Sequence, residues 1–258
     1  MDCLISSLHY CPVKSLSFLS VKSCAVRRSI GIYHDRIFAF SRNVDFEKAK
    51  LIERKPTERK LNYFLTLKNS PFLNKYNFLY NKNKLTLTSN NKELTSVSLR
   101  NLKQSSLLCD KLTKLENSLN KPIFLLHNND FPFYDTTHSN NVSNSISLIN
   151  LNSVADFEKK SNQKIEFERF RGNFYVDGIQ PWEERNWIDK IITINNVSFK
   201  VKKNIRRCSA TNLQPNTNRA TINLPSLLKK TYNHFDMGVY LTALDDGNIH
   251  IGSKVEIN

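Results

Sequence analysis

The sequence predicts a mainly β, α+β fold with a few helices. Short stretches in which apolar and polar residues alternate recur along the 258 residues, and turns rich in Asn and Asp separate them. The clearest helix is expected at 105–119, where four leucines recur at helical spacing: Leu108, Leu112, Leu115 and Leu119. These two observations together predict many short strands with a few helices.

In the first half, strands are expected at 3–10, 18–28, 35–40, 61–67, 76–80 and 84–88. Asn81-Lys82-Asn83 predicts a hairpin turn between the last two. Residues 44–60 are charged and irregular, so no element is predicted there.

In the second half, strands are expected at 123–127, 146–151, 191–194, 197–201, 238–241 and 249–252. Helices are expected from Val154, with Ser153 as N-cap, and over 224–232. A strand is also expected around Arg171, which would place Arg169 and Arg171 on one face. Gly172 has no Cβ, which would allow a ligand to approach this strand closely.

The chain is strongly basic, with 38 Lys+Arg against 23 Asp+Glu and a net charge of +15. Such a charge attracts nucleic acids, anionic membranes or acidic proteins. Most of the lysines are scattered among asparagines, which is typical of a solvated surface, and no nucleic-acid-binding motif is present. Nucleic-acid binding is therefore not expected, whereas the arginines near the motifs suit an anionic ligand.

The sequence shows no targeting or cross-linking signal. No stretch approaches the 18 consecutive apolar residues of a membrane span, and the first 25 residues lack the pattern of a signal peptide. Its five cysteines form no Cys-x-x-Cys pair, so they indicate neither a zinc site nor a disulfide framework. We expect a cytoplasmic protein with free thiols.

The stretch from Ile205 to Thr211 has the strongest chemical character. It places Cys208 directly after two arginines, and neighbouring positive charge favours the thiolate form of a cysteine. A thiolate is both a nucleophile and a soft metal ligand. The alternative is a buried cysteine on a strand that follows basic residues.

Arg207-Cys208-x-x-Thr211, followed by Pro215-x-Thr217, resembles the core motif of the MOSC domain, which is the C-terminal domain of molybdenum-cofactor sulfurases. The resemblance is greatest to the branch that contains the mitochondrial amidoxime-reducing component. Other matches occur in the same order along the chain: Tyr10-x-Pro12-Val13-Lys14-Ser15, Asp35-Arg36-x-Phe38, Phe170-Arg171-x-Asn173, Trp182 to Trp187, Gly238-x-Tyr240 and Gly252-x-x-Val255.

This resemblance implies an N-terminal MOSC-type β domain over 1–120 and a C-terminal MOSC β-barrel over 121–258. It implies that Cys208 is the catalytic residue and ligates the metal of a molybdenum cofactor, Mo-molybdopterin. The residues expected to bind the rest of the cofactor are Lys14, Ser15, Arg36, Ser143, Asn144, Arg171, Asn173, Arg207 and Thr211. Asn218, which stands where the family usually has glycine, is expected to adopt the left-handed conformation.

The activity that the resemblance implies is a molybdenum-dependent reduction of small N-hydroxylated or related N-oxygenated compounds. The electrons would come from a separate protein of the ferredoxin, flavodoxin or cytochrome type. The alternative is a sulfur or molybdenum-cofactor carrier that holds a persulfide on Cys208 without turnover.

Overall fold

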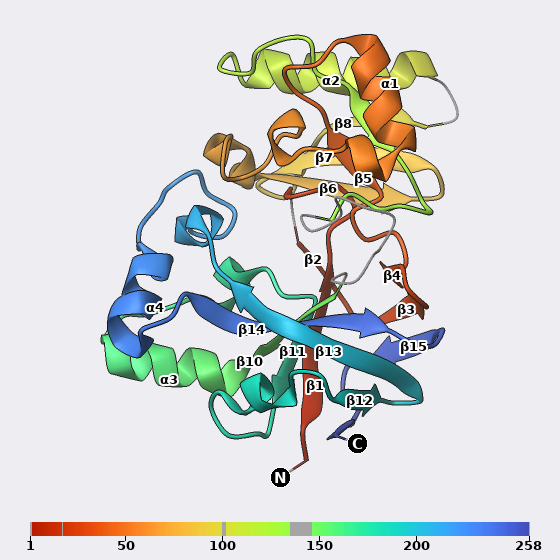
Figure 1. Cartoon of the computed structure of the whole chain (residues 1–258). Helices are drawn as coiled ribbons and strands as arrows, with labels where there is room; N and C mark the ends of the chain where they lie inside the picture. Colours follow the sequence, from red (N-terminus) through yellow and green to blue (C-terminus); the bar gives the residue numbers. More distant parts are fainter. Residues whose placement is uncertain (1, 17, 100–101, 135–145, 258) are drawn as a thin grey trace. The chain divides into compact units, whose positions relative to one another are not determined.

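The computed structural model describes residues 2–16, 18–99, 102–134 and 146–257 (Figure 1). The chain divides into two compact units. Unit 1 comprises Met1–Tyr10, Ser20–Tyr33 and Val142–Asn258, and unit 2 comprises Cys11–Leu19 and His34–Asn141. The compact units are thus discontinuous in sequence, and the two domains expected on either side of residue 120 remain a prediction.

Unit 1 is built on an eight-stranded sheet in the order β16-β12-β13-β14-β10-β11-β1-β2. Its strands are β1 (Leu4–Tyr10), β2 (Leu19–Val21), β10 (Ile146–Asn150), β11 (Phe174–Asp177), β12 (Ile191–Ile194), β13 (Val197–Arg206), β14 (Asp236–Ala243) and β16 (Val255–Ile257). A second sheet has the order β15-β3-β4, formed by β15 (Gly247–His250), β3 (Ser23–Arg27) and β4 (Gly31–Ile32). β10 and β11 run parallel, whereas β1 and β11 run antiparallel, so the first strand of the chain lies in a sheet formed mainly by its second half.

Among the described strands, the order of the large sheet begins at β16 and ends at β2, so the expected closed barrel is not shown. β1 nevertheless contacts the segment just before β16. Leu4 forms an antiparallel bridge with Lys254, and the Ile5 N–H donates to the Ser253 carbonyl at 2.9 Å. The sheet is therefore strongly curved.

Alternating side chains on the large sheet enter two apolar cores. In β10, Leu148 packs into a core with Phe174, Trp187 and Phe199, whereas Ile149 packs on the opposite side. That opposite side is covered by α3 (Leu151–Ser161) and α4 (Leu224–Tyr232), which lie together in Figure 1. Three 3-10 turns complete the unit: η4 (Phe167–Phe170), η5 (Glu183–Trp187) and η6 (Ser209–Asn212).

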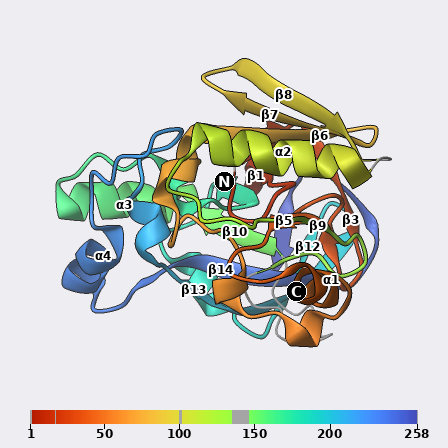
Figure 2. The same cartoon turned by 90° about the horizontal axis from the view of Figure 1, so that it is seen from above.

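Unit 2 combines a three-stranded sheet, a two-stranded sheet and two helices. The first sheet is formed by β6 (Tyr76–Asn81), β7 (Lys84–Ser89) and β8 (Lys92–Ser98), and the second by β5 (Phe38–Phe40) and β9 (Leu125–His127). The helices are α1 (Phe46–Arg54) and α2 (Leu102–Leu115), and α2 lies along the three-stranded sheet (Figure 2). Three 3-10 turns, η1 (Pro56–Glu58), η2 (Leu61–Tyr63) and η3 (Pro71–Lys75), follow α1.

The predicted mainly β, α+β class is confirmed, as are the β6–β7 and β12–β13 hairpins and α4. Residues 44–60 are not irregular, because Asp45 caps α1 by accepting a hydrogen bond from the Lys48 N–H at 2.8 Å. The strand expected at 61–67 is wrong, since the chain turns back at Leu61 into η2. The strand expected at 18–28 is divided between β2 and β3.

The boundaries of two helices also differ from the prediction, and α2 spans Leu102–Leu115 rather than 105–119. α3 begins at Leu151 because Asn150, rather than Ser153, accepts a hydrogen bond from the N–H of Asn152. Ser153 instead donates to the carboxylate of Glu184 at 2.9 Å. Within the described residues, no helix is both long and apolar enough to cross a membrane.

Candidate functional site

Cys208 lies at the end of the longest strand of unit 1. The β13–β14 ladder ends where Arg206 pairs with Asp236, and the Arg207 N–H then donates to the Phe235 carbonyl at 2.9 Å. Cys208 follows in an extended conformation as the N-cap of η6. Its carbonyl accepts two hydrogen bonds from Thr211, from the backbone N–H at 3.1 Å and from Oγ1 at 2.8 Å. The strand and the turn together fix the backbone of the cysteine.

Cys208 is the exposed member of the five cysteines, all of which the structure describes. Cys3, Cys11 and Cys109 are buried, and Cys24 is half-buried. Burial, with the negative charges of Asp177 and Glu184, raises the pKa of Cys3 to about 12, and burial also raises that of Cys109 to about 12. The alternative of a buried strand cysteine therefore does not hold for Cys208, which is open to a ligand.

The guanidinium of Arg207 is bound to the main chain of two other segments. Nε donates to the Met237 carbonyl at 2.9 Å, Nη2 donates to the same oxygen, and Nη1 donates to the Phe170 carbonyl at 2.8 Å. Burial lowers the pKa of this arginine. Arg207 thus ties the chain directly before Cys208 to β14 and to η4. These contacts give Arg207 a role in positioning Cys208.

Arg169 is a second structural cation and does not share a strand face with Arg171. The expected strand over these residues is wrong, because they form η4 and its end, and β11 begins only at Phe174. The Arg169 side chain is buried and pairs with Glu166 at 2.6 Å. Its Nη1 also donates to the Asn212 carbonyl at 2.8 Å, which ties η4 to η6 beside Cys208.

Arg171 ends η4 in the left-handed conformation, with φ of 51°, and its N–H donates to the Glu168 carbonyl at 3.0 Å. The next residue, Gly172, is needed for packing rather than for ligand access. A Cβ at this position would lie 2.4 Å from Cγ1 of Ile149, so the space expected for a ligand is filled by protein.

Asn173 is fully buried and joins three strands of unit 1. Its Oδ1 accepts from the N–H and the hydroxyl of Ser147 at 3.1 and 2.9 Å, and its Nδ2 donates to the His9 carbonyl at 3.1 Å. These bonds connect β1, β10 and the start of β11. Cofactor binding by Asn173 remains a prediction, whereas its structural role is evident.

Three other predicted residues, Lys14, Ser15 and Arg36, belong to unit 2. The Lys14 side chain is buried, and Nζ donates to the Phe133 carbonyl at 3.0 Å. Arg36 pairs with the buried carboxylate of Asp35, and its guanidinium lies 5.5 Å from the ring centres of both Phe18 and Tyr134. Ser15 and Arg36 both have positive φ, at 61° and 55°.

Asp35, which is not among the predicted site residues, organises this part of unit 2. Its carboxylate is fully buried, pairs with Arg36 and accepts from the Cys11 N–H at 2.6 Å. The adjacent Asp-Arg pair in an apolar strand segment was the available signal, because a charge in such a place needs a partner.

The structure therefore connects Arg171, Arg207, Cys208 and Thr211 through η4, η6 and β14 within unit 1. Ser143 and Asn144 lie outside the described residues. The left-handed residue of the turn after Thr211 is Asn216, with φ of 58°, and not Asn218 as expected.

Comparison with known proteins finds a family match for the region that contains Cys208. Residues 135–256 match the family model of the MOSC domain. No curated protein matches the chain. Among solved structures, the YuaD protein of Bacillus subtilis is 10% identical with a TM-score of 0.47, and the comparison covers 100% of this chain and 96% of that one. YiiM of Geobacillus stearothermophilus is 16% identical with a TM-score of 0.36 and coverage of 45% and 54%. YiiM of Escherichia coli is 13% identical with a TM-score of 0.34 and coverage of 45% and 55%. Residues 135–256, which include Cys208, therefore form a MOSC domain.

Proposed function

We propose that this protein is a molybdenum-cofactor-dependent oxidoreductase in which Cys208 ligates the metal. MOSC domains are associated with molybdenum-cofactor binding or with sulfur carriage. For this protein we favour cofactor binding. The observation that carries it is the exposed thiol of Cys208, held by β13 and η6 inside the MOSC region.

The donor chemistry at Cys208 fits such a cofactor. Thiolate sulfur suits soft metals, and an exposed cysteine can bind a group that arrives from solution. Arg207 fits less well as a cofactor contact, because three of its N–H groups already serve two carbonyl oxygens. We therefore assign Arg207 to positioning Cys208 and retain Arg171 as the cation for the anionic tail of the cofactor.

When bound, the cofactor would supply two-electron redox chemistry toward N-hydroxylated or related N-oxygenated substrates. The protein's own residues would hold it in place. Cys208 would anchor the metal, and Thr211 would fix the Cys208 carbonyl through the bonds described above. Binding of the cofactor by Lys14, Ser15 and Arg36 remains a prediction that substitution of each can test.

Electrons would come from a separate acidic redox protein of the ferredoxin, flavodoxin or cytochrome type. Three exposed cations, Lys202, Lys203 and Arg206, lie on β13 close in sequence to Cys208. A basic surface speeds association with an acidic partner. Location in the cytoplasm is part of this proposal.

The test compares Cys208→Ser with Cys24→Ser, a matched control at a half-buried cysteine of the same unit. Both variants are expressed with cofactor biosynthesis intact, and bound molybdenum and the reduction of benzamidoxime by an artificial donor are measured. Cys208→Ser should lose both, and Cys24→Ser should retain both. Full reduction by Cys208→Ser would refute the ligand assignment.

The exposed thiol also fits the alternative, a carrier that holds a persulfide on Cys208. Mass spectrometry of the purified protein separates the two functions. A persulfide on Cys208 in a protein that reduces no N-oxygenated compound would favour the carrier.

A further inference from the structure

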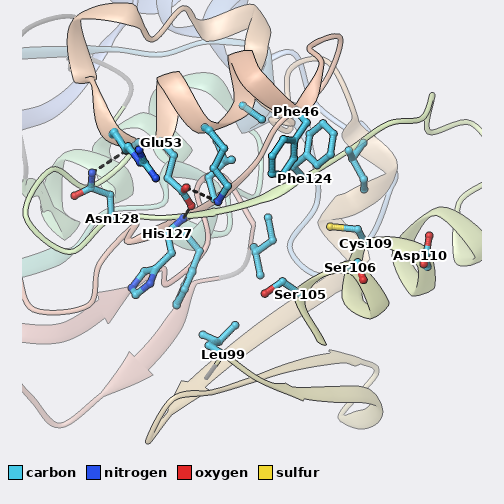
Figure 3. A pocket seen from close by; sticks show the side chains of 17 residues that line it. Phe46, Glu53, Leu99, Ser105, Ser106, Cys109, Asp110, Phe124, His127 and Asn128 are labelled. Atoms are coloured by element: carbon cyan, nitrogen blue, oxygen red, sulfur yellow. Dashed lines mark hydrogen bonds and ion pairs between the residues drawn. The ribbon is translucent and has the colours of Figure 1, made fainter. Parts of the chain in front are cut away.

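Unit 2 contains a cavity of about 680 Å³ that the proposed function does not use (Figure 3). It lies between α1 and α2, and β9 with the residues before it forms one wall. Phe46 and Phe124 meet edge to face at one end, with ring centres 5.9 Å apart, and Glu53, His127 and Asn128 lie at the other. Its volume falls within the roughly 300–1,000 Å³ of small-molecule sites.

The walls of this cavity are mainly apolar. α1 contributes Phe46 and Ala49, α2 contributes Cys109, and the chain from Ile123 to Leu126 completes the lining. Ala49, Cys109 and Leu126 are buried, whereas Phe46 is 55% exposed. An exposed aromatic ring at the edge of an apolar cavity is a surface that a ligand would cover with a gain in free energy.

Most charged groups of the lining already have a partner of opposite sign. The Glu53 carboxylate accepts from Lys50 Nζ at 2.8 Å and from the His127 N–H at 2.9 Å. Asp110 lies 3.6 Å from Lys121 Nζ. Burial lowers the pKa of His127, whose ring stacks on Phe38 with centres 4.6 Å apart, so the imidazole is neutral near pH 7.

Arg54 is the remaining charged group. It ends α1 and lines the cavity, and among the described residues it forms no hydrogen bond or ion pair. Its guanidinium therefore leaves one positive charge at an otherwise balanced and mainly apolar cavity. A ligand that complements this lining has an apolar body and one negative charge.

We propose that the cavity between α1 and α2 binds a small apolar molecule with a single carboxylate, whose body lies against Phe46 and Phe124 and whose charge pairs with Arg54. This site is independent of the cofactor proposed for unit 1.

The experiment titrates the full chain with octanoate and with 1-octanol by isothermal titration calorimetry. The wild type should bind octanoate saturably and more tightly than 1-octanol. Arg54→Gln should weaken octanoate binding by about fivefold and leave 1-octanol unchanged, because a partly exposed ion pair contributes up to about that factor. Equal octanoate affinity in Arg54→Gln and the wild type would refute the role of the charge.

A second pair of variants tests the place of binding. Ser105→Trp adds an indole to the cavity lining and should abolish binding of both probes. Leu107→Trp adds the same group two residues along α2, at a side chain that is 58% exposed and outside the lining, and should bind as the wild type does. Absence of octanoate binding in the wild type, or equal loss in both tryptophan variants, would overturn the proposal.

Discussion

Replacing Arg207 with methionine tests whether this arginine positions Cys208 or binds an anion. The substitution removes all three hydrogen bonds to the Met237 and Phe170 carbonyls. A hydrogen bond from a charged donor contributes about 1.5–3 kcal/mol, and methionine restores part of the apolar contact. With two carbonyl oxygens losing their donors, the free energy of unfolding should fall by about 3 kcal/mol.

Urea unfolding of the apoprotein measures this loss, because it needs no cofactor. Arg207→Lys should lose about 2 kcal/mol, since one ammonium cannot reproduce the planar fork of the guanidinium. Arg206→Met is the matched control. Arg206 is exposed, and its guanidinium lies 4.5 Å from the centre of the Phe235 ring, so the loss of unfolding free energy should stay below about 1 kcal/mol. Arg207→Met with wild-type stability but reduced molybdenum content would refute the positioning role and restore Arg207 as a cofactor contact.

A half-buried histidine and a buried glutamate of unit 1 predict opposite pH dependences of stability. Burial lowers the pKa of His9 to about 4. As the pH falls, the unfolded chain therefore protonates this histidine before the folded chain does. Stability should fall by up to about 3 kcal/mol as the pH drops from about 6.5 to 4, and His9→Gln should remove this dependence in urea unfolding. If an NMR titration gave His9 an ordinary imidazole pKa, this explanation of the acid-induced loss of stability would be contradicted. Burial raises the pKa of Glu184, against the hydrogen bonds from Asn150 and Ser153. The contribution of Glu184 to the free energy of unfolding should be complete below the pKa of this carboxyl in the unfolded chain. It should decline as the pH rises through the pKa of the carboxyl in the folded protein. The stability of the wild type relative to Glu184→Gln should therefore be greatest in acid, and a difference that grows toward neutral pH would exclude this reasoning.

The parts of the fold that could be predicted were those with strong local patterns. The β12–β13 hairpin follows from two apolar runs around Asn195-Asn196, and Asn195 does adopt positive φ, at 54°. α1 was missed although Asp45 and the spacing of Ala49 and Ile52 were readable, because charged residues dominate the segment. The turn η4 could not be distinguished from a strand by sequence. Tertiary packing decides its conformation, because Phe170 is buried and Phe167 half-buried in the apolar core that α3 and α4 cover.

The sequence could predict which residue of the candidate site is reactive, but not how the side chains around it are arranged. The motif identified Cys208, and the structure exposes it. The motif could not show that Arg207 would bind main-chain carbonyls, because Met237 and Phe170 lie about 30 and 37 residues away in the chain. The same holds for Gly172, whose missing Cβ accommodates Ile149 from a neighbouring strand.

The position of β1 has a consequence for the order in which the protein is made. β1 ends at Tyr10, but its partner β11 starts at Phe174. The whole segment between them must therefore be synthesised before the two strands can pair. Unit 2 ends at residue 141, so all of it is synthesised before β11, and until then β1 lacks this partner. Folding of the MOSC region therefore depends on the late pairing of β1, which is synthesised well before β11, and residues 135–256 produced alone would leave β11 with an unpaired edge.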